Sequence, residues 1–170
     1  MKNLSLLLII TLIAFSSCAQ KSATNKDRSV YYLIRHAEKD KSDKTNRDPK
    51  LTVEGKNRAE SWAKYFKDKN LDAVYSTDYN RTRETALPTT ITNGLGLQFY
   101  NPGTINYEEF LKNTRGKKVL IVGHSNTTPM FANGLLGEEK YEAMTEDDNS
   151  SLYKVTVAKD TKISEILVID

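Results

Sequence analysis

From Val30 onward, the chain switches repeatedly between two spacings of apolar positions. Short apolar runs rich in β-branched and aromatic residues predict strands at 30–34, 71–76, 97–100 and 118–123. Apolar residues at helical spacing predict helices at 52–69, 80–92, 105–113 and 125–136. The last two segments alternate apolar and polar residues, which predicts a terminal hairpin at a sheet edge, formed by 152–157 and 162–169.

Residues typical of helix starts and helix ends lie at the boundaries of the predicted helices. Thr52 is the expected N-cap of the first helix, Asp78 or Asn80 caps the second, and Gly94 closes it. Gly137 ends the helix that follows the strand at 118–123. The core-facing stripe of the first helix is expected to comprise Val53, Ala59, Trp62, Ala63 and Phe66.

Regular alternation of strands and helices predicts an α/β fold, a three-layer sandwich around a mostly parallel central sheet. The strand at 118–123 is apolar on both faces, so we expect it in the middle of that sheet. In such sheets, ligands bind outside the carboxyl ends of the strands. Arg35 and His36, the segment 76–81, and His124 with Ser125 all follow strands. The sequence therefore predicts that these residues meet in one crevice.

The N-terminus differs from the rest of the chain. Lys2 precedes an apolar run from Leu4 to Phe15, then small residues and Cys18. A basic start, a short apolar run and a small-residue boundary are typical of an export signal, here 1–17. The run is shorter than the ~20 residues that a membrane-spanning helix needs.

Cys18 is the single cysteine, so the chain forms no internal disulfide. The segment before it resembles the lipobox of bacterial lipoproteins, which implies that Cys18 carries lipid and anchors the protein to an envelope membrane, periplasmic or on the outer face. The polar stretch 18–28 then serves as a tether for a domain at 29–170. The alternative is an ordinary cleaved signal with an incidental thiol.

The remaining composition fits one soluble globular domain in a chain of 170 residues. The net charge is +3, and because Lys2 is the only charge before Cys18, removal of 1–17 lowers it by one. Basic and acidic residues are interleaved, as on a solvated surface, so we expect no nucleic-acid partner. We expect a monomer.

The side chains at the strand ends predict a site for a phosphate dianion. The planar guanidinium groups of Arg35 and Arg81 pair bidentately with phosphate oxygens, and Arg83 is nearby. The helices that begin near Asn80 and Ser125 can add backbone N–H groups. A neutral imidazole in this cage can attack phosphorus, giving a phosphohistidine that water cleaves. This chemistry needs no metal or other cofactor.

Other interpretations of the two histidines are less consistent with their neighbours. A metal site lacks a Cys, His or Asp at ligand spacing, and the adjacent arginines repel a cation. A purely structural role for His36 does not explain why Arg35 precedes it, or why the other histidine, His124, also follows a strand and a glycine.

Three motifs, "LIRHAEK", "YSTDYNRTRETA" and "VLIVGHSN", resemble in order and spacing the histidine phosphatase superfamily, in its phosphoglycerate mutase-like branch. The resemblance implies a phosphoglycerate mutase-like fold. It also implies that His36 is the phosphorylated nucleophile and that Arg35, Arg81 and His124 bind the phosphoryl group, with Ser125 beside them. Arg83 and Thr85 lie within the second motif and are expected to have supporting roles.

The resemblance leaves more than one candidate for the proton donor. Larger members carry an acidic residue between the second arginine and the second histidine, and here Glu84, Glu108 and Glu109 lie in that interval. Glu84 falls in the helix of the second motif and is expected to be structural, which leaves Glu108 and Glu109 as candidate acids. The segment 100–117 is too short to close over a substrate, which favours a phosphatase over a mutase.

Two functions follow as hypotheses. The first is a metal-independent phosphomonoester phosphatase that acts through His36 on a small phosphate ester or a phosphorylated protein. The second is a non-catalytic envelope lipoprotein that binds phosphate or a phosphorylated ligand in the same pocket. A third possibility is a structural envelope lipoprotein, for which substitutions in the pocket would have no effect on function.

Overall fold

The computed structural model describes residues 28–169. The strands are β1 (Ser29–Arg35), β2 (Ala73–Ser76), β3 (Leu97–Phe99), β4 (Lys118–Gly123), β5 (Ser151–Ala158) and β6 (Thr161–Val168). The helices are α1 (Val53–Phe66), α2 (Asn80–Asn93), α3 (Tyr107–Asn113) and α4 (Thr127–Leu136). None of these helices has the length and hydropathy needed to cross a bilayer. The expected export signal and Cys18 lie outside the described residues, as does all of the expected tether except Arg28.

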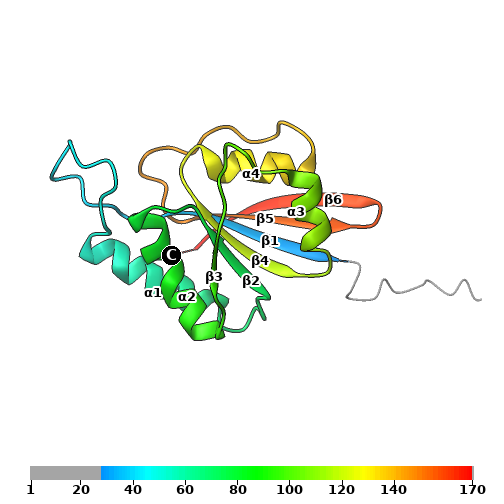
Figure 1. Cartoon of the computed structure of the whole chain (residues 1–170), viewed down its shortest axis with the longest axis horizontal. Coiled ribbons are helices and arrows are strands. Elements are labelled where there is room, and N and C mark those ends of the chain that lie inside the picture. The colour runs from blue at the N-terminus through cyan, green and yellow to red at the C-terminus, as the bar shows by residue number, and fades with distance from the viewer. Residues whose placement is uncertain (1–27, 170) are drawn as a thin grey trace, which may run out of the picture.

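The strands form one sheet in the order β3-β2-β4-β1-β5-β6 (Figure 1). The first four strands in this order are parallel, and the β5–β6 hairpin joins β1 antiparallel. The predicted mostly parallel sheet, the interior position of β4 and the edge position of the terminal hairpin are therefore confirmed. Because β1 and β4 are in register from Val30 with Lys118 to Arg35 with Gly123, their carboxyl ends stop side by side.

Helices cover both faces of the sheet, which gives the predicted three layers. Alternate residues of β1 and β4 point to opposite faces of the sheet, so each strand contributes side chains to two hydrophobic cores. One core joins Leu33 and Ile121 to Phe131 of α4 and Phe110 of α3. The other joins strand residues to α1 and α2 and includes Tyr32, Ile34, Trp62, Phe66 and Ala86. Figure 1 shows α3 and α4 on one side of the sheet and α1 and α2 on the other.

Several predicted helix ends are confirmed and others are corrected. The Thr52 hydroxyl accepts the N–H of Gly55, and Gly94 and Gly137 end their helices in the left-handed conformation. Val53, however, is 77% exposed and is not part of the core-facing stripe. It occupies the first position of α1, where the side chain points away from the sheet.

Gly55 allows the close approach of α1 to the segment that follows β1. A Cβ at this position would overlap the carbonyl oxygen of Glu38, two residues after His36, whereas nothing lies within 4 Å of a Cβ at Gly96. We expect Gly55→Ala to lower the free energy of unfolding by ~1–3 kcal/mol, because backbone must shift to admit the methyl group. Chemical denaturation checks this, and Gly96→Ala is the control that should remain near wild type. Equal stabilities of the two variants would contradict the packing described here.

Candidate active site

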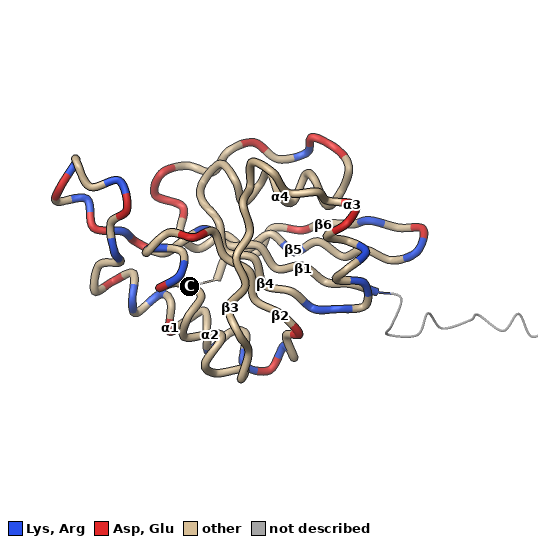
Figure 2. The backbone as a smooth tube through the Cα atoms, viewed as in Figure 1, with Lys and Arg blue, Asp and Glu red and all other residues tan. Residues whose placement is uncertain are grey.

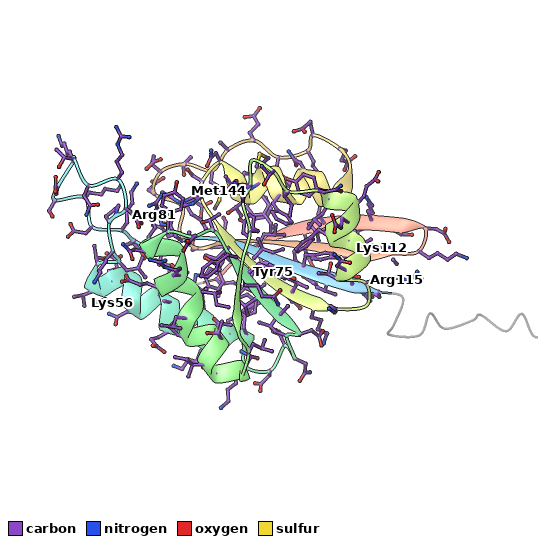
Figure 3. The ribbon with its side chains drawn as sticks, in the orientation of Figure 1. Lys56, Tyr75, Arg81, Lys112, Arg115 and Met144 are labelled. Carbon is purple, nitrogen blue, oxygen red and sulfur yellow. The ribbon has the colours of Figure 1, made fainter. Side chains whose placement is uncertain are left out.

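The three strand ends meet at one pocket, as the sequence predicts. The pocket has a volume of about 630 Å³. Its lining includes five of the expected site residues, namely Arg35, His36, Arg81, His124 and Ser125. β1, β4 and the start of α2 carry these side chains to the carboxyl end of the sheet (Figure 1). Figure 3 shows Arg81 at this end of the molecule.

The surroundings of His36 fix its tautomer. The ring Nδ1 lies 2.7 Å from the carbonyl oxygen of Ala37, and a carbonyl only accepts, so Nδ1 carries the hydrogen. The other nitrogen, Nε2, then holds a lone pair, and it makes no hydrogen bond within residues 28–169. Burial, followed by the nearby charges of Arg35 and Arg81, lowers the pKa of His36 to about 3. His36 is therefore neutral at neutral pH, with the lone pair of Nε2 unprotonated.

A chain of hydrogen bonds holds this ring in place. The His36 N–H donates to the carbonyl oxygen of Gly123, which joins β1 to the end of β4. The next residue, Ala37, donates its N–H to the hydroxyl of Thr85, and that hydroxyl donates to the carbonyl oxygen of Arg81. Thr85 thus supports the site by connecting the segment after β1 to α2.

His124 has the opposite tautomer. Its Nδ1 lies 3.3 Å from the Nη2 of Arg81, a permanent donor, so Nδ1 accepts. Its Nε2 lies 2.9 Å from the Thr77 hydroxyl, which donates its own hydrogen to Thr82 and accepts the Nε2 hydrogen. Burial and the charge of Arg81 lower the pKa of His124 to about 4. The His36 and His124 ring centroids are 5.5 Å apart.

The two arginines have donors that the protein itself does not use. Arg35 is 3% exposed and donates through Nη1 to the carbonyl oxygens of Thr145 and Asp148. The Nε atoms of both Arg35 and Arg81 are buried without a hydrogen-bond partner among the described residues. Leaving a buried charged donor unsatisfied is costly. The acceptor oxygens of a phosphate dianion are of the type that such guanidinium donors bind.

The start of α2 differs from the prediction. Its N-cap is Tyr79, which provides no side-chain cap, so neither Asp78 nor Asn80 has that role. Instead, Asp48 accepts the N–H of Asn80 and lies 3.5 Å from the Nη1 of Arg81. The N–H of Asn80 is thus already used by the protein. α4 also begins at Thr127, two residues later than the expected Ser125.

The candidate acids on α3 are not brought to the pocket. Glu108 and Glu109 lie in the first turn of α3, where the side chain of Asn106 caps the helix, and neither lines the pocket. The carboxylates that do line it belong to Asp78 and Glu146. Asp78 pairs with Arg83 at 2.7 Å, and Glu146 lies 3.6 Å from the Nη2 of Arg35.

The two other residues singled out in the second motif act outside the pocket. Arg83 is bound to Asp78 and to the side chain of Asn80 rather than to the phosphate-binding groups. Glu84 accepts the N–H of Leu51, so its role is structural, as expected.

Sequence reasoning missed two side chains at the site. Lys39 adds a cation to the lining, and Glu146 comes from the connection between α4 and β5. Neither directly follows a strand, so no local signal distinguished them. Tyr79 lies in the segment 76–81 that was expected at the crevice, and its ring centroid is 5.0 Å from that of His124. No group of three His, Cys, Asp or Glu side chains in the described part of the chain is placed to hold a metal ion.

The lowered pKa values predict how stability depends on pH. In the unfolded chain both histidines titrate near 6.5, but in the folded protein they titrate near 3 and 4. Between these values the unfolded chain binds more protons, so the free energy of unfolding falls as the pH drops below about 6.5. Each histidine contributes a slope of ~1.4 kcal/mol per pH unit within that window.

Chemical denaturation between pH 7 and pH 4 measures this dependence. The variant His36→Asn lacks one of the two groups and should therefore show a shallower slope than wild type. Parallel curves for the two proteins would show that His36 is not buried in its neutral form.

Comparisons with known proteins agree with this geometry. Residues 31–101 match the model of a family described as the histidine phosphatase superfamily (branch 1). No curated protein matches the chain. A protein described as the phosphohistidine phosphatase SixA from Agrobacterium tumefaciens has a similar structure, with a TM-score of 0.56, 20% identity, and coverage of 82% of this chain and 97% of that one.

Two further structures share the fold. A phosphoglycerate mutase from Bacillus anthracis gives a TM-score of 0.62 at 15% identity, over 84% of this chain and 94% of that one. A mutant of the phosphoserine phosphatase from Entamoeba histolytica, in complex with phosphoserine, gives 0.61 at 16% identity, over 80% and 94%. At these identities the likeness establishes the fold, and the predicted phosphoglycerate mutase-like architecture is confirmed.

Proposed function

We propose that the chain, whose residues 31–101 match the model of the histidine phosphatase superfamily (branch 1), is a metal-independent phosphatase of phosphate monoesters that forms a phosphohistidine on His36. The observation that supports this most is the state of the His36 ring. Its Nδ1 hydrogen is bound to the carbonyl oxygen of Ala37, so the free lone pair is on Nε2. The same pocket is lined by Arg35 and Arg81, each of which has a buried Nε without a hydrogen-bond partner among the described residues.

In the first step, the Nε2 lone pair of His36 forms a bond to phosphorus while the bond from phosphorus to the ester oxygen breaks. The leaving oxygen takes the bonding electrons and a proton. The ring becomes positively charged because Nδ1 keeps its hydrogen, and the carbonyl oxygen of Ala37, 2.7 Å from Nδ1, stabilises that charge. Arg35 and Arg81 stabilise the charge on the phosphoryl oxygens.

In the second step, water attacks the phosphorus and gives up a proton, which restores the one that the leaving oxygen took in the first step, and the bond from phosphorus to Nε2 breaks. The lone pair returns to Nε2, and inorganic phosphate leaves. Arg35 and Arg81 keep their charge throughout, so they bind the phosphoryl group equally before and after the transfer. Both steps balance with water as the only co-substrate.

We propose Glu146 as the proton donor in place of Glu108 and Glu109. It lines the pocket, and its Oε2 lies 3.6 Å from the Nη2 of Arg35, one of the phosphate-binding groups. Asp78, the other carboxylate in the lining, is already paired with Arg83 at 2.7 Å.

A leaving-group series tests this assignment. General acid catalysis contributes about 10²–10⁴-fold when the leaving group needs a proton. We therefore expect Glu146→Gln to lower kcat/KM for an alkyl phosphate by about 10²-fold and to leave an aryl phosphate within severalfold of wild type. The adjacent variant Asp147→Asn is the matched control. Equal losses on both substrates would exclude Glu146 as the donor.

The proposed function itself is tested by hydrolysis of p-nitrophenyl phosphate by the full chain in excess EDTA. Turnover that EDTA does not change is the expected result. Turnover lost in EDTA and restored by a divalent cation would contradict a metal-independent mechanism. No turnover with retained binding of inorganic phosphate would instead indicate the non-catalytic phosphate-binding protein.

We propose in addition that the chain is exported and that lipid on Cys18 anchors it to an envelope membrane. The support comes from the sequence: the basic start, the apolar run, and the lipobox-like segment before the single cysteine. Outside the cytoplasm, small nutrient phosphate esters are a better candidate substrate class than intracellular signalling proteins. Mass spectrometry of the N-terminal peptide tests the modification, since an unmodified Cys18 in the exported protein would exclude it.

A further inference from the structure

We propose that a basic turn on the pole opposite the active site contacts anionic lipid headgroups, so that the active site faces away from the membrane. The basic turn consists of Lys112, Arg115, Lys117 and Lys118, between α3 and β4, together with Arg28. The proposal extends the proposed lipid anchoring, and it does not depend on phosphatase activity.

The turn is bonded to the point where the chain enters the domain. The Val30 N–H donates to the carbonyl oxygen of Lys117, and the Gly116 N–H donates to the Ser29 hydroxyl. The Ser29 hydroxyl in turn donates to the carbonyl oxygen of Thr114. Arg28 immediately precedes this junction. The described chain therefore begins beside the turn.

Cations are concentrated here. Lys112, Arg115 and Lys117 are exposed, and Lys118 is half-buried, with its Nζ donating to the carbonyl oxygen of Lys69. Asp72 is bonded to the turn, where its Oδ2 accepts the Lys118 N–H. Figure 2 shows several Lys and Arg positions at the end of the molecule where β1 begins, and Figure 3 labels Lys112 and Arg115 there, whereas charges of both signs are mixed over the loop after β1.

The active site lies at the other end of the same strands. β1 runs from Ser29, beside the turn, to Arg35, in the pocket. β4 likewise runs from Lys118 in the turn to Gly123, next to His124. Figure 3 shows Lys112 and Arg115 at one end of the molecule and Arg81 at the other. A bilayer in contact with the turn therefore leaves the pocket open to solvent.

The length of chain before Arg28 points to a membrane as the partner. Cys18 and Arg28 are ten positions apart. Ten residues span at most about 35 Å when fully extended, and a flexible chain of that length averages roughly 18 Å. A lipid on Cys18 keeps the basic turn close to the bilayer. Anionic headgroups attract cations only within a Debye length of about 8 Å, and a tether of this length lets the turn come that close to the bilayer.

Lysine acetylation of the full chain on vesicles tests the proposal. Vesicles of phosphatidylcholine alone are compared with vesicles that also contain phosphatidylglycerol. On the anionic vesicles we expect acetylation of Lys112 and Lys117 to slow at least about threefold relative to Lys50 and Lys56, which lie near the start of α1, and high salt should remove the difference. Figure 3 shows Lys56 at the far end from the turn.

A second experiment reverses the charge of two arginines of the basic turn. Arg28→Glu with Arg115→Glu keeps Lys112 and Lys117 as reporters and should abolish their protection. Lys50→Glu with Lys56→Glu changes the net charge equally and should leave the protection intact, and circular dichroism checks that both variants fold. Three results would overturn the proposal. The first is no protection of Lys112 and Lys117 on anionic vesicles, the second is equal protection on neutral vesicles, and the third is protection that persists after charge reversal of the two arginines. Loss of phosphatase activity alone bears on the proposed function and not on this surface.

Discussion

Replacing His36 by alanine is expected to lower kcat for p-nitrophenyl phosphate by at least about 10⁴-fold, because the variant lacks the atom that forms the covalent intermediate. His36 is 3% exposed and neutral, so its removal leaves the charges of the pocket in place. Binding of inorganic phosphate, measured by calorimetry, should therefore persist. Steady-state turnover and phosphate affinity are measured on the same preparation.

Two results would contradict this expectation. Turnover above about one hundredth of wild type would mean that another group attacks phosphorus, since loss of a nucleophile costs far more than that. Loss of phosphate binding together with a lower unfolding midpoint would mean that His36 mainly supports the fold. Comparison with wild-type unfolding separates these explanations.

Replacing Arg81 by alanine should have the second-largest effect, a loss of about 10²–10³-fold in kcat/KM, the usual cost of removing one preorganised donor from a transition-state site. Arg81 has a buried Nε without a hydrogen-bond partner in the described residues, and its Nη2 lies 3.3 Å from His124. Its removal also takes away the donor that holds the Nδ1 of His124. Phosphate binding should weaken in parallel with kcat/KM.

Arg83 is the matched control for this experiment. It is the same residue type two positions later, but its guanidinium is bound to the carboxylate of Asp78, and both side chains are largely exposed. We expect Arg83→Ala to change kcat/KM by no more than about fivefold, equivalent to the ~1 kcal/mol that an exposed ion pair contributes. Similar losses in the two variants would show that general charge, and not the position of Arg81, governs the rate.

The strand ends were predictable because their signal is local. The apolar runs before Arg35 and His124 define β1 and β4, and parallel pairing then forces their carboxyl ends together. The central position of β4 followed from its apolar faces in the same way. The main site residues could thus be located from the sequence, and the structure adds their tautomers, burial and pKa values.

The remaining features depend on contacts between segments far apart in the sequence. Asp48 reaches the start of α2 from a loop that an isolated bridge between Lys39 and Leu51 closes. Glu146 is held at the pocket because Arg35 donates to the carbonyl oxygens of its neighbours Thr145 and Asp148. These two residues are 110 and 113 positions from Arg35 in the sequence. Helical spacing also does not say on which side the first turn of a helix lies, which is why Val53 was assigned wrongly. The contacts of Asp48 and Glu146 leave no periodic pattern in the sequence of either contacting segment.

The most direct test is to trap the intermediate. The full chain is mixed with p-nitrophenyl phosphate, stopped within milliseconds in alkali, where phosphohistidine survives, and digested for mass spectrometry. We expect a burst of p-nitrophenol that does not exceed one equivalent per chain, with phosphate on the His36 peptide, and neither signal in His36→Ala. Turnover without a phosphorylated peptide, or with phosphate on another residue, would contradict catalysis through His36.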